Sequence, residues 1–160
     1  MDVTWITDKI AVGGGIWNAV NMAEIARAGI THIINMQIEF DDTSLAAAHE
    51  IRVMWTAIDD DFEPKPVDIF ERGVEFALNA FQVPESRILV HCAAGVHRAP
   101  MMALALLSVL GWKLEEGVAL LALHRPVVEF PQVYLDSVEA FLKQHQRGRR
   151  HPGVIPGSTS

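Results

Sequence analysis

The only cysteine of the chain, Cys92, is followed six positions later by Arg98. A cysteine thiolate is a nucleophile, and an arginine guanidinium offers a planar pair of donors to two phosphate oxygens. Small residues at positions 93–95 let the backbone approach an oxyanion closely. These residue types at this spacing predict a phosphate-binding loop with a nucleophile at its base. The predicted phosphate-binding residues are Ala93, Ala94, Gly95, Val96, His97 and Arg98.

The segments around this loop predict how it is held. An apolar β-rich run at 87–91 precedes it, and an apolar run typical of a buried helix follows at 100–110. A strand-to-helix loop of this kind points successive backbone N–H groups at an anion beside the helix N-terminus. That arrangement favours the thiolate form of Cys92. We expect His91 to hold the loop through the hydrogen bonds of its ring.

Hydrophobic periodicity along the chain predicts alternating strands and helices. This order is typical of an α/β domain with a mostly parallel central sheet flanked by helices, in which ligands bind beyond the carboxyl ends of the strands. The loop that holds Cys92 lies at such an end. The predicted strands are 4–6, 10–12, 31–36, 52–58 and 87–91, and the predicted helices are 18–27, 43–50, 66–81, 100–110, 114–123 and 132–144.

Length and composition restrict the possible function. The chain has 160 residues, half of them hydrophobic, which fits one catalytic domain (residues 1–146) followed by a flexible Gly/Pro/Ser-containing tail (147–160). A net charge of −7 argues against a broad nucleic-acid or anionic-membrane surface. One cysteine excludes an internal disulfide and a multi-cysteine zinc site. We expect a cytoplasmic protein without a metal or other cofactor, and the sequence leaves the oligomeric state open.

The loop resembles the phosphate-binding loop of the cysteine-dependent phosphatases. The resemblance rests on His91, Cys92, Gly95 and Arg98 in this order between a strand and a helix. The chain length is similar to that of the small, atypical dual-specificity phosphatases of the protein tyrosine phosphatase superfamily. This resemblance implies hydrolysis of a phosphomonoester through a phosphocysteine intermediate on Cys92. It also implies that Arg98 and the loop N–H groups stabilise the transferred phosphoryl group.

Such a reaction needs a general acid to protonate the leaving oxygen. In the family this acid is an aspartate about thirty residues before the cysteine, and the run 55–60 lines up with the pattern that precedes it. The resemblance therefore implies Asp60 as the acid, with Asp61 as the alternative. We expect the clustered carboxylates to raise one another's pKa.

One departure from the common pattern and several local resemblances point to a substrate. Most of the family carries Ser or Thr where this chain has Ala99, and the missing hydroxyl puts the release of the thiolate in doubt. The sequence 98–100, Arg-Ala-Pro, resembles the starch-excess type of plant glucan phosphatase, and the segments 111–112 and 124–126 are similar to the related laforin. Phe130 precedes a proline where starch-excess enzymes contact glucan. The resemblance thus implies a phosphoglucan substrate, with stacking candidates Phe62, Phe130, Trp55 and Tyr134, of which Phe62 is expected to be exposed.

Other residues have supporting roles in this interpretation. We expect His97 at the rim of the pocket, where its charge tunes the site near neutral pH. Arg125 is expected to form an ion pair beneath the catalytic loop, and Asn35 to hydrogen-bond the loop from below. Three alternatives remain: a phosphotyrosine or phosphoserine protein phosphatase, a non-catalytic phosphate-binding module, and a redox sensor based on Cys92.

Overall fold

The computed structural model describes residues 1–149 and contains one five-stranded sheet. The strand order is β1-β2-β5-β3-β4, and only the β1–β2 pair is antiparallel. The central strand is β5, so the loop that follows it lies in the middle of the carboxyl edge. The strands are β1 (Val3–Trp5), β2 (Ile10–Gly13), β3 (His32–Gln37), β4 (Arg52–Ile58) and β5 (Ile88–His91).

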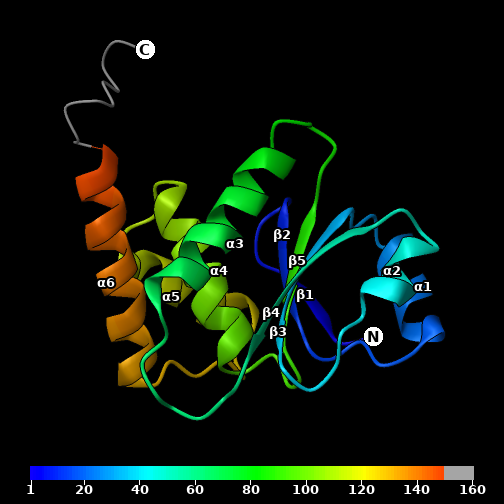
Figure 1. The fold of residues 1–160 in the computed structure, drawn as a ribbon, viewed down its shortest axis with the longest axis horizontal. Helices are drawn as coiled ribbons and strands as arrows, with labels where there is room; N and C mark the ends of the chain where they lie inside the picture. Colours follow the sequence, from blue (N-terminus) through cyan, green and yellow to red (C-terminus); the bar gives the residue numbers. More distant parts are fainter. Residues whose placement is uncertain (150–160) are drawn as a thin grey trace.

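Helices cover both faces of this sheet (Figure 1). Two short helices, α1 (Ala19–Arg27) and α2 (Thr43–Ala47), lie on one face. The other face carries α3 (Val67–Ala80), α4 (Arg98–Val109), α5 (Leu114–His124) and α6 (Gln132–Arg149). Each face has its own hydrophobic cluster, and the larger one lies on the α4 side. The predicted fold class, an α/β domain with a mostly parallel sheet, is confirmed.

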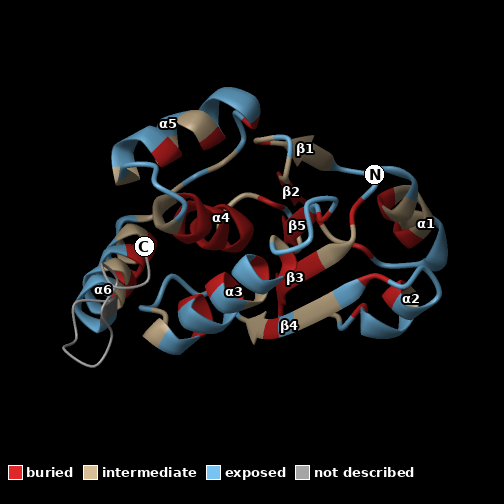
Figure 2. Ribbon diagram, turned by 90° about the horizontal axis from the view of Figure 1, so that it is seen from above, coloured by how far each residue is buried: buried red, intermediate tan, exposed pale blue. Residues whose placement is uncertain are grey.

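Helix α4 is the best buried helix of the domain (Figure 2). Every residue from Arg98 to Leu107 is buried, because α3, α5 and α6 surround this helix on the sides that the sheet leaves open. A helix that is apolar on all sides is stable only in such an enclosed place. Its N-terminus therefore sits in a rigid environment directly after the β5 loop, which is what a preorganised anion site requires.

Most element boundaries agree with the sequence-based expectations, and two differ in an informative way. Helix α4 begins at Arg98, two residues earlier than predicted, because Pro100 is tolerated in the first helical turn. Helix α6 continues to Arg149, so residues 147–149 extend the helix instead of beginning the predicted tail. The rest of that predicted tail, 150–160, lies outside the described residues.

No helix within residues 1–149 is long and apolar enough to cross a bilayer. In the same part of the chain, no group of three or more His, Cys, Asp or Glu side chains is placed to hold a metal ion.

Candidate active site

Cys92 lies at the base of the loop between β5 and α4, and it is 2% exposed. Its Sγ accepts hydrogen bonds from two backbone N–H groups, that of Gly95 at 3.2 Å and that of Ala99 at 3.4 Å. The second donor belongs to the first turn of α4, where N–H groups have no partner within the helix. Both contacts favour a negatively charged sulfur, so the geometry suits a thiolate nucleophile.

The carbonyl groups of residues 93–95 in the catalytic loop (residues 92–97) point outward, where fixed donors hold them. Arg125 donates from Nε to the Gly95 carbonyl oxygen at 2.9 Å and from Nη2 to that of Ala94 at 3.3 Å. The Ala93 carbonyl accepts from the Gly15 N–H at 2.9 Å. The predicted position of Arg125 beneath the loop is thus confirmed.

The loop N–H groups face the opposite way from these carbonyls. Those at positions 93, 94, 96 and 97 have no acceptor within residues 1–149. Gly95 has φ +68°, and this left-handed conformation turns the chain back over Cys92. A row of unpaired N–H groups above a sulfur at a helix N-terminus forms a concave site for a tetrahedral anion.

Arg125 is itself held by the N-terminal segment. Its Nη1 and Nη2 donate to the two carboxylate oxygens of Asp2 at 2.9 and 2.7 Å, and Nη1 also donates to Thr4 Oγ1. The hydrogen bond from Arg125 lowers the pKa of Asp2 despite its partial burial. Asp2 and Arg125, which lie far apart in the sequence, therefore fix the catalytic loop from below.

Arg98 points back over the loop and meets Glu39, which follows β3. Its Nη1 and Nη2 donate to the Glu39 carboxylate at 2.7 and 2.9 Å, and Nη1 also donates to the carbonyl of Ile58. The Arg98 hydrogen bond lowers the pKa of Glu39. Burial opposes the charge of Arg98, but Glu39 and the nearby Cys92 outweigh it and raise the pKa of Arg98.

One edge of the Arg98 guanidinium remains for a ligand. Its Nε is buried and has no hydrogen-bond partner within the described residues. An unpaired buried donor is costly unless a ligand satisfies it. The Nε–Nη2 edge is therefore the one that can take two phosphate oxygens, while Glu39 fixes the other edge.

The three neighbouring aspartates of the β4–α3 loop (residues 59–66, here the acid loop) differ in their surroundings. Asp60 is half-buried and reaches the catalytic loop through His97, whose Nδ1 lies 2.8 Å from Asp60 Oδ2. Asp61 points away and forms an ion pair with Lys65 at 2.5 Å. The Lys65 hydrogen bond lowers the pKa of Asp61, which contradicts the expected mutual increase for this residue. Of the two candidates, the structure brings only Asp60 into contact with the catalytic loop.

The aromatic candidates for sugar stacking are separated by burial. Phe62 is 53% exposed beside the catalytic loop, as expected, and Trp55 is 40% exposed. Phe130 is partly buried against the core. Tyr134 is wholly buried, so it offers no ring face to a substrate and the prediction for it is wrong. Its hydroxyl instead donates to Asp60 Oδ1 at 2.8 Å.

Two supporting predictions are also corrected. The ring of His91 does not hold the catalytic loop, because its Nε2 lies 2.7 Å from a carboxylate oxygen of Asp42 before α2, where both side chains are fully buried. Asn35 donates to the carbonyl of Phe40 and to Asp42, and so it stabilises the β3–α2 loop. Both residues keep in place the segment that carries Glu39.

Sequence reasoning missed Glu39, Asp2 and Glu129. Glu39 follows the predicted strand 31–36 at the carboxyl edge, which is a usable signal. Glu129 contacts the catalytic loop twice, through His97 Nε2 at 2.8 Å and through its own N–H, which donates to the Val96 carbonyl. Nothing in the sequence around Asp2 or Glu129 indicates these long-range partners.

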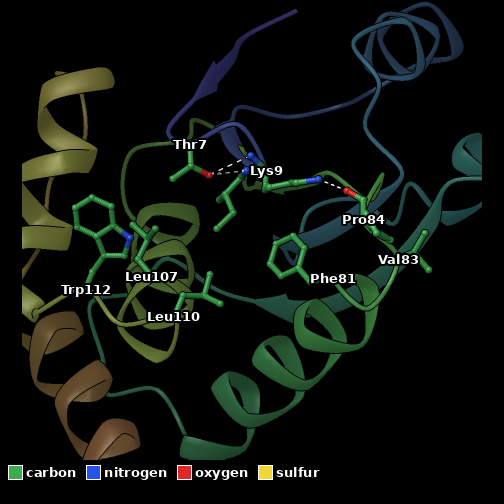
Figure 3. A pocket seen from close by; sticks show the side chains of 9 residues that line it. Thr7, Lys9, Phe81, Val83, Pro84, Leu107, Leu110 and Trp112 are labelled. Atoms are coloured by element: carbon green, nitrogen blue, oxygen red, sulfur yellow. Dashed lines mark hydrogen bonds between the residues drawn. The ribbon is translucent and has the colours of Figure 1, made fainter.

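An apolar pocket of about 450 Å³ lies at the opposite edge of the sheet (Figure 3). It opens between the turn before β2, the end of α3 and the end of α4, and Lys9 at its rim donates to the carbonyl of Pro84. It shares no lining residue with the catalytic loop. The candidate active site is therefore the concave loop at Cys92 and not this pocket.

Comparison with known proteins decides the family. The model of the dual specificity phosphatase catalytic domain matches residues 15–144, which include every residue of the catalytic loop and the acid loop. The chain belongs to the dual-specificity phosphatases. It therefore carries the catalytic domain of a cysteine-dependent phosphatase.

This dual-specificity phosphatase matches different shares of the length of its relatives. Protein phosphatase Slingshot homolog 3 of Rattus norvegicus is 29% identical over 131 residues, which cover 80% of this chain and 19% of that protein. Dual specificity protein phosphatase 13B of Mus musculus is 28% identical over 123 residues, 71% of this chain and 60% of that one. The chain thus spans about a fifth of the length of this Slingshot relative.

Solved structures of similar fold cover nearly the whole dual-specificity phosphatase chain. The crystal structure of PTPMT1 has a TM-score of 0.79 at 20% identity and covers 93% of this chain and 99% of that one. Human DUSP28 has a TM-score of 0.76 at 17% identity, covering 91% and 96%. At these sequence identities, the similarity shows a shared fold only.

The shape of the catalytic loop predicts the outcome of adding one methyl group. A Cβ on Gly95 would overlap Arg125 Nη2 and lie 2.7 Å from the Gly13 carbonyl oxygen. We expect Gly95→Ala to lower kcat/KM for an aryl phosphate by at least about 100-fold, because a misplaced loop loses preorganised donors.

Gly111→Ala is the matched control. Gly111 also has a positive φ, +116°, but a Cβ there meets nothing within 4 Å. It should lose only about 1 to 3 kcal/mol of stability through backbone strain and keep its kcat/KM. Equal activity of the two variants, with both folded by circular dichroism, would contradict this account of the loop.

Proposed function

We propose that this phosphatase hydrolyses phosphomonoesters through a phosphocysteine on Cys92. The thiolate attacks phosphorus and forms the S–P bond while the bond from phosphorus to the leaving oxygen breaks. Asp60 gives its proton to that oxygen, so the leaving group departs as a neutral alcohol or phenol. The loop N–H groups and the free edge of Arg98 stabilise the charge on the three equatorial oxygens.

The second step returns the enzyme to its starting state. Asp60, now ionised, takes a proton from a water molecule that attacks phosphorus. The S–P bond breaks, the Cys92 thiolate leaves, and inorganic phosphate is released. The N–H groups of Gly95 and Ala99 stabilise the departing thiolate.

One observation carries this proposal: unpaired donors surround a sulfur acceptor. The catalytic loop holds four N–H groups without acceptors and a buried, unpartnered Arg98 Nε beside Cys92 Sγ, within the part of the chain that the structure describes. Unused donors of this kind are expensive in an empty site and favourable once a phosphate dianion fills it.

Charge at the rim supports a substrate class. Glu39 and Glu129 keep 43% and 69% of their side chains exposed beside the site. Asp60 and Glu129 share the single His97 ring, which leaves an excess negative charge there. Such a rim repels a polyanionic ligand and tolerates a single phosphate on a neutral or basic carrier. We therefore place phosphorylated serine, threonine or tyrosine side chains first, which agrees with the protein phosphatases among the relatives. The cytoplasmic location expected from the sequence is a separate part of the proposal.

A phosphoglucan is the second candidate. Phe62 is 53% exposed next to His97 and offers a hydrophobic surface on which a sugar ring could stack. The Arg-Ala-Pro end of the catalytic loop and Phe130 before Pro131 are the sequence features that favour it.

The related fold of PTPMT1 has been solved with PI(5)P, and the acidic rim argues against a phosphoinositide for this chain.

Parallel phosphate-release assays test these proposals. The substrates are an aryl phosphate, a phosphotyrosyl and a phosphoseryl peptide with flanking lysines, phosphorylated amylopectin, and vesicles that contain PI(5)P. We expect turnover of the aryl phosphate and the peptides, abolished by Cys92→Ser and lowered roughly 100- to 10,000-fold by Asp60→Asn for the phosphoseryl peptide.

The substrate order separates the candidates. Faster release from amylopectin than from either peptide, reduced by Phe62→Ala, would favour the glucan hypothesis over the protein one. Release from vesicles above all other substrates would overturn the argument from rim charge. No release from any substrate, with phosphate still bound, would leave a phosphate-binding module.

The sequence departure at Ala99 yields a separate prediction. Ala99→Ser places a hydroxyl beside Sγ as a third donor to the leaving thiolate, after the N–H groups of Gly95 and Ala99. Hydrolysis of the phosphocysteine, which we expect to limit turnover in this chain, should therefore accelerate. One added hydrogen bond corresponds to an increase in kcat of about two- to tenfold. The value of kcat/KM should not change, because it reports only the steps up to phosphocysteine formation.

Ala105→Ser is the control, since it buries a hydroxyl in the same fully buried helix at a distance from Cys92. It should lower stability without raising kcat. An unchanged kcat in Ala99→Ser would contradict a limiting second step.

A further inference from the structure

Three loops of the domain meet at the ring of His97. His97 belongs to the catalytic loop, Asp60 to the acid loop, and Glu129 to the connection between α5 and α6. The ring Nδ1 lies 2.8 Å from Asp60 Oδ2, and Nε2 lies 2.8 Å from Glu129 Oε1. The side chain is 17% exposed, so these contacts are partly shielded from water. One imidazole thus bridges two carboxylates on separate loops.

A second set of contacts fixes the same acid loop. The buried Tyr134 hydroxyl donates to Asp60 Oδ1 at 2.8 Å and accepts the N–H of Phe62 at 3.2 Å. Phe62 has φ +58°, a strained conformation for this residue, and its ring meets the His97 ring edge-on at 5.1 Å. Burial and the Asp60 contact raise the pKa of Tyr134, so its hydroxyl stays a donor throughout the range of an enzyme assay.

These contacts leave Asp60 able to react. A carboxylate has about four lone-pair positions, and the two hydrogen bonds occupy one on each oxygen. A proton for the leaving group can bind at a remaining position without breaking either contact. His97 and Tyr134 therefore restrict where the carboxyl group points while leaving it able to exchange a proton.

We propose that His97 is a positioning residue for the general acid, and that its imidazolium ties Asp60 to Glu129 across the mouth of the site. This inference rests on the proposed role of Asp60 and extends it to the residue that holds it. The imidazolium has two N–H donors and satisfies both carboxylates at once. A neutral ring has one N–H, so it can donate to Asp60 or to Glu129 but not to both.

The charges around the ring determine the direction of the pH dependence. Burial lowers the pKa of His97, but the hydrogen bonds to Asp60 and Glu129 outweigh it and raise that pKa above its ordinary value of about 6.5. Arg98 is its cationic neighbour along the chain, and Tyr134 beneath Asp60 stays neutral. The bridge is therefore complete at pH values below the raised pKa of His97 and is lost as pH rises through that pKa.

A leaving-group series separates positioning of the acid from general damage to the site. Phenyl phosphate needs a proton on its leaving oxygen, whereas dinitrophenyl phosphate needs it far less. We expect His97→Ala to lower kcat/KM about 10- to 100-fold for phenyl phosphate and less than about threefold for dinitrophenyl phosphate.

Two further variants test the bridge itself. His97→Asn keeps a neutral amide donor near the place of Nδ1, and we expect it to restore part of the phenyl phosphate activity without the alkaline decline that His97 causes. Glu129→Gln removes the second carboxylate, so the alkaline limb of kcat/KM should shift to lower pH. Glu85→Gln, which removes an equal charge from an exposed turn far from the site, should leave the profile unchanged.

The outcomes distinguish this inference from the function on which it rests. Asp60→Asn is included in the same series. If Asp60→Asn does not reduce phenyl phosphate turnover, the general acid is assigned wrongly and the role of His97 falls with it. A different outcome is that Asp60→Asn reduces turnover while His97→Ala lowers kcat/KM equally for phenyl phosphate and dinitrophenyl phosphate, or for neither. Asp60 then keeps its role, and the positioning role of His97 is overturned.

Discussion

The direction in which the catalytic loop turns its peptide groups is the constraint on which the site depends. The carbonyls of Ala93, Ala94 and Gly95 point outward to Gly15 and Arg125, so the N–H groups face the space above Cys92. One peptide group cannot turn both its N–H and its carbonyl towards a phosphate. The donors that hold the carbonyls on the outer side, Gly15 and Arg125, are therefore as necessary as the N–H groups that bind the anion. The buried α4 helix and the central position of β5 keep this loop rigid from below.

Each cation at the site is paired with a carboxylate from another part of the chain. Arg125 is held by Asp2, Arg98 by Glu39, and His97 by Asp60 together with Glu129. Charge-assisted hydrogen bonds fix these side chains before a substrate arrives, which removes reorganisation from the reaction. Because Asp60 and Glu129 share the one His97 ring, the rim keeps an excess negative charge although the loop attracts an anion. The loop therefore selects for a phosphate group, while the rim selects against an anionic carrier.

The fold and the nucleophile could be predicted from sequence because their signals are local. The order of strand, Cys92, Gly95, Arg98 and helix lies within one short segment, and hydrophobic periodicity marks the elements on both sides. Glu39, Asp2 and Glu129 could not be assigned, since their roles come from contacts between residues far apart in the chain. The prediction for Tyr134 is wrong for the same reason: its helical spacing is compatible with either face, and only the packing of α6 on α4 buries the ring.

Direct capture of the phosphocysteine tests the central claim. The Asp60→Asn variant is mixed with dinitrophenyl phosphate, quenched in acid within milliseconds and analysed by intact-protein and peptide mass spectrometry. Because this leaving group departs without a proton donor while hydrolysis lacks its base, the intermediate should accumulate. The account predicts one phosphoryl group per chain on the peptide that contains Cys92. Phosphate release without such an adduct, or an adduct on another residue, would contradict it.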